Sequence, residues 1–380
     1  MDFAFNEEQE ELRAMAQAFA EENSGSEQIR KAMESELGYD PALWGQIGSE
    51  LGWTSVHIPE EYGGLGLGYV ELVALMEIMG GALVCSPFFS SVCLGANALL
   101  VAGSEEQKQA HLPGIAEGTT RATLAYSGTG GNWDASAVEV VATPSGDGFK
   151  LSGTASFVVD GHSAELIVVA ARRADSTGTD GISLFVIAAD RAGLTRRVLP
   201  TMDQTRRLAE LAFDDVDVSA SELMGVEGEA WPALSRTLDL AAIALAAEQV
   251  GGAQRCLDMS VAYAKEREQF GRPIGSFQAI KHKCADMMVK VESARSAAYY
   301  AGCAVSESNE SEINTVAPLA KAYCSDAYFT CAADCIQIHG GVGFTWEYDV
   351  HLYFKRAKSS ESLLGDASFH REQLAQRINL

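Results

Sequence analysis

Apolar residues follow a helical period in the first part of the 380-residue chain, up to about residue 118. Leu12, Met15 and Phe19 lie three or four positions apart, and similar spacing recurs over residues 42–51. Such spacing places apolar side chains on one face of an α-helix. Glycine-rich stretches such as EYGGLGLG, residues 61–68, interrupt this pattern and indicate loops. The sequence therefore predicts an N-terminal all-helical domain over residues 1–118.

Between residues 119 and 225 the pattern changes to short runs that are rich in β-branched residues. Four runs stand out, namely AVEVVAT, GFKLSGTASFVV, AELIVVAAR and GISLFVIAA, and turn-forming residues bound them. Runs of this length between turn signals are typical of β-strands. A region of strands and turns of this size predicts an antiparallel barrel or sandwich.

The helical period returns in the last part of the chain, residues 226–380. An apolar stripe from Leu240 to Ala264 predicts a long helix, and a second helix is predicted after a break, with Ser276 as its N-cap. A third is predicted from about Ile313 to Ile338, and a last one closes the chain. Antiparallel neighbours of this length form four-helix bundles. The predicted fold class is α+β: N-terminal helices, a central antiparallel β domain and a C-terminal four-helix bundle.

The charge balance argues against two classes of partner. The formal net charge is −24 and the pI is near 4.6, so neither nucleic acid nor an anionic membrane surface is expected to bind. The stretch from Ile78 to Ser104 is uncharged, but its glycines, serines and proline favour buried helices over a membrane span. The N-terminal residues show no signal or transit peptide pattern, which favours a cytoplasmic protein.

The eight cysteines form no C-x-x-C pair. Cys331 and Cys335 are spaced by three residues, but no matching histidine pair accompanies them, so no metal site is predicted. Without an export signal, the cysteines are expected to be reduced thiols in the core.

Two motifs in the last third of the chain suggest anion binding. The first is the break between two predicted helices, where Arg267 and Arg272 flank Phe270 and Gly271. Guanidinium groups suit a diphosphate and an aromatic ring suits a nucleotide, although the break is also compatible with a plain helix–helix turn. The second is QIHGGVGFTWE, residues 337–347, whose paired glycines permit close approach of an anion but also suit a helix C-cap.

Together these motifs resemble the acyl-CoA dehydrogenase family of flavoproteins. YAKEREQFGRPIGSFQAIKHKCADM is similar to one family signature, QIHGGVGFTWEYD to another, and GWTSVHIPEEYGGLG to a third near the N-terminus. The resemblance implies an FAD enzyme that oxidises the Cα–Cβ bond of an acyl-CoA thioester and passes electrons to an electron-transfer flavoprotein or a similar acceptor. It also implies a dimer or tetramer in which residues of one subunit reach the FAD of its neighbour. These residues are Arg267, Phe270, Gln278, Gln337, Gly340 and Gly341.

The chain departs from the family where the β domain is expected to face the flavin. Ser127 keeps the hydroxyl of the family motif and Phe157 keeps an aromatic ring, so both are retained as cofactor-binding candidates. Val159, however, stands where a threonine normally hydrogen-bonds the flavin N5, and a valine side chain has no donor. The family lysine in this region is Ala155.

The position of the catalytic base differs as well. The usual glutamate after the C-terminal motif is replaced by Leu364, and the alternative position on the first bundle helix is Ala241, followed by Ala242. Neither leucine nor alanine can accept a proton. Asp239 is the first candidate for a displaced base, with Glu361 and Asp366 near the loop.

Three functions are compatible with these residues. The favoured one is a subunit that completes the FAD site in a heteromeric acyl-CoA dehydrogenase, resembling the non-catalytic type known from steroid side-chain catabolism and acting on bulky acyl-CoA substrates. The second is an active homo-oligomeric dehydrogenase with a displaced base. The third is a related flavin oxidase.

Overall fold

The computed structural model describes residues 5–380, so the first four residues of the N-terminal stretch lie outside the described part. The chain forms two compact units that interleave along the sequence. A helical unit contains the described residues up to Lys31 together with 68–84 and 242–380, and a mixed unit contains 32–67 and 85–241. The predicted division into domains 1–118, 119–225 and 226–380 stays a proposal.

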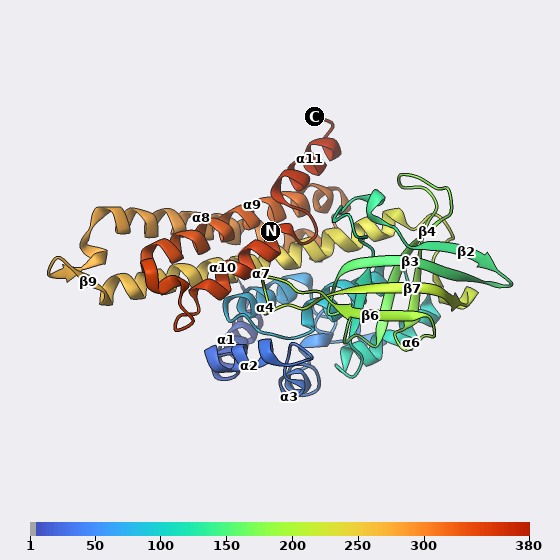
Figure 1. Cartoon of the computed structure of the whole chain (residues 1–380), viewed down its shortest axis with the longest axis horizontal. Coiled ribbons are helices and arrows are strands. Elements are labelled where there is room, and N and C mark those ends of the chain that lie inside the picture. The colour runs from blue at the N-terminus through green and yellow to red at the C-terminus, as the bar shows by residue number, and fades with distance from the viewer. Residues whose placement is uncertain (1–4) are drawn as a thin grey trace. The chain divides into compact units, whose positions relative to one another are not determined.

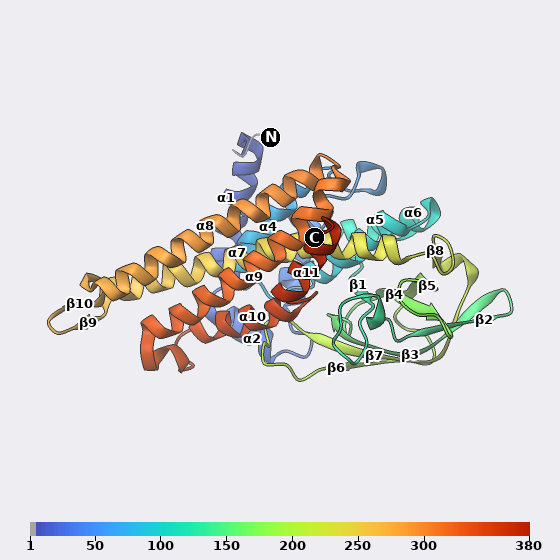
Figure 2. The same cartoon turned by 90° about the horizontal axis from the view of Figure 1, so that it is seen from above.

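Long helices make up the helical unit, and Figures 1 and 2 show α7 and α8 running side by side. Its helices are α1 (Glu7–Asn23), α4 (Tyr69–Gly81), α8 (Gln278–Ser306), α9 (Glu310–His339), α10 (Val350–Ser362) and α11 (Ala367–Arg377). Two helices, α2 (Ser26–Glu34) and α7 (Trp231–Glu266), contribute residues to both units.

Glycines permit close helix packing in this unit. A Cβ on Gly80 of α4 would collide with the carbonyl of Glu248 on α7, and one on Gly251 would collide with the carbonyl of Glu77. On the next face of α7, Gly252 leaves room for the buried ring of Tyr328 on α9. At the crossing of α4 and α7 the backbones can therefore approach closely, because neither Gly80 nor Gly251 puts a side chain between them.

The mixed unit is built on an eight-stranded sheet with the order β6-β7-β3-β2-β4-β5-β8, and β1 pairs with β4. The strands are β1 (Ala122–Ala125), β2 (Val141–Ser145), β3 (Gly148–Val159), β4 (Leu166–Arg173), β5 (Ile182–Ala188), β6 (Leu194–Val198), β7 (Leu208–Val218) and β8 (Leu223–Met224). Its α-helices α3 (Pro41–Gly45), α5 (Asn97–Ala102) and α6 (Glu105–Ala116) are short. Alternate side chains of β3 and β7, among them Leu151, Leu211 and Phe213, enter the core of the sheet.

The predicted fold class is confirmed: helices, then a sheet, then a helical bundle. The sheet is mixed, however, because β1 and β2 each run parallel to β4. The uncharged stretch is buried as expected, through a π-helical turn over Phe89–Ala96 that leads into α5. No described helix is long and apolar enough to cross a membrane.

Two local predictions were wrong. Ser276 is not the N-cap of α8, because the chain makes a 3-10 turn over Ile274–Ser276 and Phe277 takes the cap position without a side-chain bond. The end of the chain also holds two helices rather than one. They separate at Leu364 and Gly365, and the carboxylate of Asp366 caps α11 by accepting a bond from the N–H of Phe369.

Candidate functional site

The break between the long helices is a tight hairpin at one end of the helical unit. It consists of β9 (Glu268–Gln269), β10 (Arg272–Pro273) and the central pair Phe270 and Gly271. Both central residues have positive φ, 56° and 74°, as a two-residue hairpin with a type I′ turn requires. Glycine adopts this conformation freely, whereas phenylalanine is strained there.

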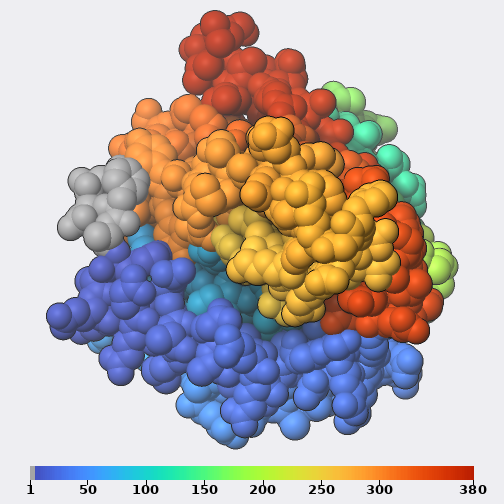
Figure 3. Space-filling view, turned by 90° about the vertical axis from the view of Figure 1, so that its left-hand side faces the viewer, coloured from blue at the N-terminus to red at the C-terminus, as the bar shows by residue number. Residues whose placement is uncertain are grey.

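The hairpin exposes its side chains instead of burying them. Phe270 is 92% exposed; Figure 1 shows the hairpin, labelled β9, at the left-hand tip of the long helices, and its gold-coloured region faces the viewer in Figure 3. Its ring meets Phe277 edge-on, with the centroids 6.1 Å apart, and the guanidinium of Arg272 lies 4.3 Å from the centroid of Phe277. Arg267 and Gln278 are also exposed. An exposed aromatic ring in a strained conformation, on a hairpin flanked by the exposed residues Arg267 and Arg272, suggests a surface made for a ligand or a partner.

The second motif follows the end of α9. Gly340 has φ 64° and ψ −140°, a backbone conformation close to one reserved for glycine, and its N–H caps α9 by donating to the carbonyl of Ile336. Gly341 has ordinary φ, and a Cβ built on it meets no atom within 4 Å. No contact within the described chain therefore requires a glycine at residue 341. Open space over this backbone suits the close approach of an anion, so these residues fit a bound diphosphate.

Stacked rings bring the two motifs together. Tyr263 lies in the last turn of α7, four residues before Arg267, and its ring stacks on His339 with centroids 4.3 Å apart. Burial opposes protonation of His339, but hydrogen bonding to the side chain and carbonyl of Cys335 outweighs it and raises the pKa of the imidazole. The sequence interpretation missed this link because the two rings are far apart along the chain.

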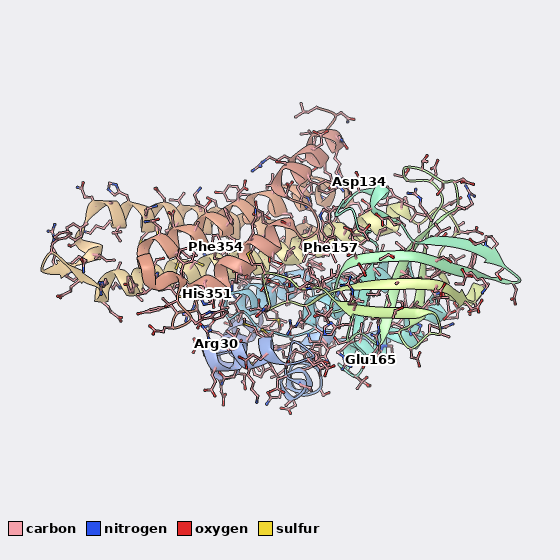
Figure 4. All side chains as sticks on the ribbon, in the orientation of Figure 1. Arg30, Asp134, Phe157, Glu165, His351 and Phe354 are labelled. Carbon is pink, nitrogen blue, oxygen red and sulfur yellow. The ribbon has the colours of Figure 1, made fainter. Side chains whose placement is uncertain are left out.

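In the mixed unit, Phe157 lies on a bulge of β3. The register of β3 with β7 shifts between Ala155 and Val158, and Phe157 has φ 57°. Such a bulge turns a side chain away from the alternation of its strand. The ring lies 6.4 Å from that of Trp133, which the sequence interpretation did not select, and Figure 4 shows Phe157 and the neighbouring Asp134 at the same end of the sheet.

The hydroxyl and the carbonyl of Ser127, beside this bulge, already form hydrogen bonds with backbone groups. The hydroxyl of Ser127 donates to the carbonyl of Asn132 at 2.9 Å, and the carbonyl of Ser127 accepts from the N–H of Ser156 at 2.7 Å. The hydroxyl of Ser127 therefore has only its acceptor lone pairs left for a cofactor. Val159 is buried and offers no side-chain donor, as the sequence indicated. The rings of Trp133 and Phe157, both partly exposed, lie together at this end of the sheet.

The positions expected for a base carry aliphatic residues in both units. Leu364 is 5% exposed, and Ala241 and Ala242 are buried on α7. The two acids near the loop already have partners, because Asp366 caps α11 and Glu361 pairs with Lys358 at 2.8 Å.

Asp239, the predicted alternative base, is buried on α7 in the mixed unit, and its role as a base stays a prediction.

All eight cysteines are free thiols. No cluster of three potential metal ligands occurs among residues 5–380.

Comparisons with known proteins agree with the motifs. Residues 6–119 match the family model "Acyl-CoA dehydrogenase, N-terminal domain" and residues 228–379 match "Acyl-CoA dehydrogenase, C-terminal domain". The chain is 37% identical over 369 residues to "Acyl-CoA dehydrogenase IpdE2" of Mycolicibacterium smegmatis, covering 97% of each protein.

Solved structures of complexes are similar as well. A chain of the ChsE4-ChsE5 complex of Mycobacterium tuberculosis superposes with a TM-score of 0.90 at 29% identity, covering 100% of this chain and 99% of that one. A chain of a variant of the Tcur3481-Tcur3483 steroid ACAD gives a TM-score of 0.87 at 33% identity, with 98% of both chains covered.

Proposed function

Because the chain belongs to the acyl-CoA dehydrogenase family of oxidoreductases, we propose that it completes the FAD site of a related subunit in a heteromeric dehydrogenase. In this assembly the partner supplies the base that removes the α proton of the acyl-CoA. The proposal extends the similarity to two-component complexes, one of which is described as a steroid ACAD. The substrate proposed on that ground is a bulky acyl-CoA, such as one with a steroid side chain.

One contrast carries this proposal. The groups that a subunit lends to its neighbour are exposed and complete, namely Arg267, Phe270 and the open backbone at Gly341. The group that a subunit needs for its own chemistry is replaced by the buried aliphatic side chain of Leu364. A leucine can exclude water and fill space, but it cannot take a proton.

Each exposed group has a task in this proposal. The guanidinium of Arg267 would pair with the diphosphate of FAD, and the N–H of Gly341 would donate to the same group, since the N–H of Gly340 is already used in capping α9. Phe270 and Gln278 would lie against the adenine side, with Gln337 beside them. When bound, FAD supplies the acceptor for the hydride that leaves the β carbon. With a net charge of −24, the chain depends on these local cations to attract a phosphate-bearing ligand.

The second candidate function is an active homo-oligomer in which Asp239 is the base. The observation in its favour is the burial of this carboxylate, 5% exposed, two residues before Ala241. In that case the Asp239→Asn variant abolishes turnover and still binds FAD. Unchanged turnover in this variant removes Asp239 from consideration.

The first experiment is an absorption spectrum of the chain expressed alone and of the chain co-expressed with a related dehydrogenase subunit. We expect a stoichiometric flavin spectrum and acyl-CoA turnover only for the co-expressed pair. Stoichiometric FAD and turnover by the chain alone would contradict the proposal and favour the homo-oligomer. Rapid reoxidation of the reduced flavin by oxygen, with ligand bound, would instead favour an oxidase.

A matched pair of glycine variants tests the anion site itself. Gly341→Ala adds a methyl group where a ligand is proposed to approach, and Gly45→Ala adds one at another position with open space and without positive φ. Neither should disturb the fold. Only Gly341→Ala is expected to weaken FAD binding by the co-expressed pair. Equal FAD affinity in both variants would place the diphosphate elsewhere.

A further inference from the structure

The helical unit contains one lysine that is completely buried. Lys321 lies on α9 with 0% exposure, and Nζ donates to the hydroxyl of Ser325 at 2.9 Å. Nζ also lies within hydrogen-bonding distance of three backbone carbonyls, those of Ser360 at 3.1 Å, Glu361 at 3.3 Å and Gly365 at 3.0 Å, so its three N–H groups are shared among four acceptors. Buried ammonium groups are rare because desolvation is costly, so a lysine in this position requires an explanation.

The three carbonyls belong to one short segment, Ser360–Gly365, which leaves the end of α10 and leads to α11. The last carbonyls of a helix have no partner within the helix, and a buried helix end must find partners elsewhere. Lys321 is the hydrogen-bond partner of the carbonyls of Ser360 and Glu361. Its Nζ also contacts the carbonyl of Gly365 on the other side of the loop. A single cation thus ties both ends of the segment to α9.

His370 holds the same segment near its C-terminal end. Its ring lies on α11, is 3% exposed, and donates from Nε2 to the carbonyl of Leu364 at 2.9 Å. Together, Lys321 and His370 bind the carbonyls of four residues out of six. Leu364 and Gly365 are thereby kept at φ 62° and 101°, which leucine in particular adopts only under constraint.

The position of Nζ is itself fixed by a polar network. Ser325, one turn after Lys321, accepts a second hydrogen bond from the side-chain amide of Gln249 on α7 at 3.0 Å, and both residues are buried. Burial lowers the pKa of Lys321 to about 7, while nearby Cys324, Glu361 and Asp366 favour its charged form. The network is more extensive than a helix cap alone requires.

We propose that Lys321 is a positioning residue that holds the backbone of Leu364 and Gly365 in the shape of a catalytic-base loop. This inference rests on the proposed function, in which residue 364 occupies the place of the base. This chain has a leucine instead of a carboxylate at residue 364, but it has the hydrogen bonds from Lys321 that would hold the backbone of a base at that position. A carboxylate returned to residue 364 therefore stands on a loop that is already shaped for proton transfer.

Hydrogen exchange tests the positioning directly, without any cofactor. The Lys321→Met variant replaces the ammonium by an apolar group of similar length and leaves the three carbonyls without their donor. We expect the amides of Leu363 and Gly365 to exchange on the order of tenfold faster, because the loop opens more often. Lys358→Met is the matched control, since Lys358 reaches the same segment only through the side chain of Glu361. Exchange that is equally slow in both variants would overturn the proposal.

Ser325→Ala keeps the test possible if Lys321→Met fails to fold. This variant removes only the hydroxyl that orients Nζ, so a smaller acceleration is expected, confined to the same amides. An acceleration spread over the whole helical unit, or none at all, would contradict a positioning role.

A proton-transfer assay separates positioning from general stability. In Leu364→Glu, co-expressed with the related subunit, the new carboxylate should exchange the α proton of butyryl-CoA or a steroid acyl-CoA with deuterium from solvent, in addition to the exchange that the partner's own base gives in the unsubstituted pair. The C–H bond breaks towards the carboxylate, the electron pair moves into the thioester enolate, and a solvent deuteron returns to the carbon, so no oxidant is consumed. Adding Lys321→Met should abolish this additional exchange while thioester affinity stays the same.

The two proposals fail in different ways. If Leu364→Glu adds no proton exchange although Lys321→Met accelerates amide exchange, residue 364 is not the base position and the contrast that carries the proposed function is wrong, while Lys321 still holds the loop. If amide exchange is unchanged in Lys321→Met and Leu364→Glu retains its proton exchange in that background, the role of Lys321 is wrong and the proposed function is unaffected.

Discussion

Two loops of the helical unit differ in where their polar groups lie: one buries them and the other exposes them. In the segment Ser360–Gly365, carbonyls point inward and find donors from Lys321 and His370. In the hairpin between α7 and α8, Phe270 is 92% exposed and Arg267 extends from the surface. The buried loop is complete within one chain. The exposed loop has a strained residue, Phe270, and a charged one, Arg267, and both are available to a ligand or another subunit.

This difference assigns the two loops to different tasks. A loop held by internal hydrogen bonds keeps its shape in the free chain, so its variants should change stability. A loop whose side chains face outward contributes little to folding, so its variants should change binding. Each prediction below addresses one side of this comparison.

The largest expected effect is on the stability of the buried loop. Lys321→Met leaves three carbonyls without their donor, and each unmet buried group costs about 1–3 kcal/mol, so we expect a loss of about 4 kcal/mol in the free energy of unfolding. Denaturant titration of the free chain measures this value. A change below about 1 kcal/mol would mean that water or a relaxed loop satisfies the carbonyls.

The next effect is the pH dependence that His370 imposes on the same loop. Burial, and then the nearby charge of Lys321, lower the pKa of His370 to about 3, and Nδ1 has no hydrogen-bond partner among the described residues. Between pH 6.5 and 3 the unfolded chain binds a proton that the folded chain does not. Stability should therefore fall as the pH falls through this window, by up to about 3 kcal/mol at pH 4.

His370→Gln is the control for that titration, since it keeps a donor for the carbonyl of Leu364 but carries no titrating ring. The difference in unfolding free energy between pH 7 and pH 4 should shrink in this variant. An equal pH dependence in both proteins would assign the titration to other groups.

On the exposed side, Arg267→Gln should weaken FAD binding by the co-expressed pair. Loss of one charge-assisted hydrogen bond corresponds to about 2 kcal/mol, or roughly thirtyfold in affinity. The unfolding free energy of the chain alone should stay within about 0.5 kcal/mol of the parent, because the side chain is exposed. A large loss of stability with unchanged FAD affinity would reverse the assignment of the two loops.

The smallest effect is expected at the tip of the hairpin. Phe270→Asn creates an Asn-Gly pair, which is favoured in a type I′ turn, so the free chain should gain up to about 1 kcal/mol in stability. The same change removes the exposed ring and should weaken FAD binding or pairing with the related subunit. Thermal unfolding and FAD titration measure the two quantities. Destabilisation would show that the ring supports the turn through Phe277.

The sequence allowed the α+β class and the order of its parts to be predicted, because helical and strand periods are local properties. The runs GFKLSGTASFVV and GISLFVIAA became β3 and β5 nearly as bounded. The sequence also indicated that residues 159, 241 and 364 have side chains without acid–base chemistry, since residue identity alone decides this.

The tertiary structure decided how these parts meet. The parallel pairing of β1 and β2 with β4, the stacking of Tyr263 on His339 and the failure of Ser276 as a cap depend on contacts that no local period contains. Lys321 is the clearest case: its charge suggests a solvent-exposed position, yet it is buried against carbonyls 39 to 44 residues away. A charged group can be buried only where the fold gathers enough partners to replace water, and that is a property of the packed chain.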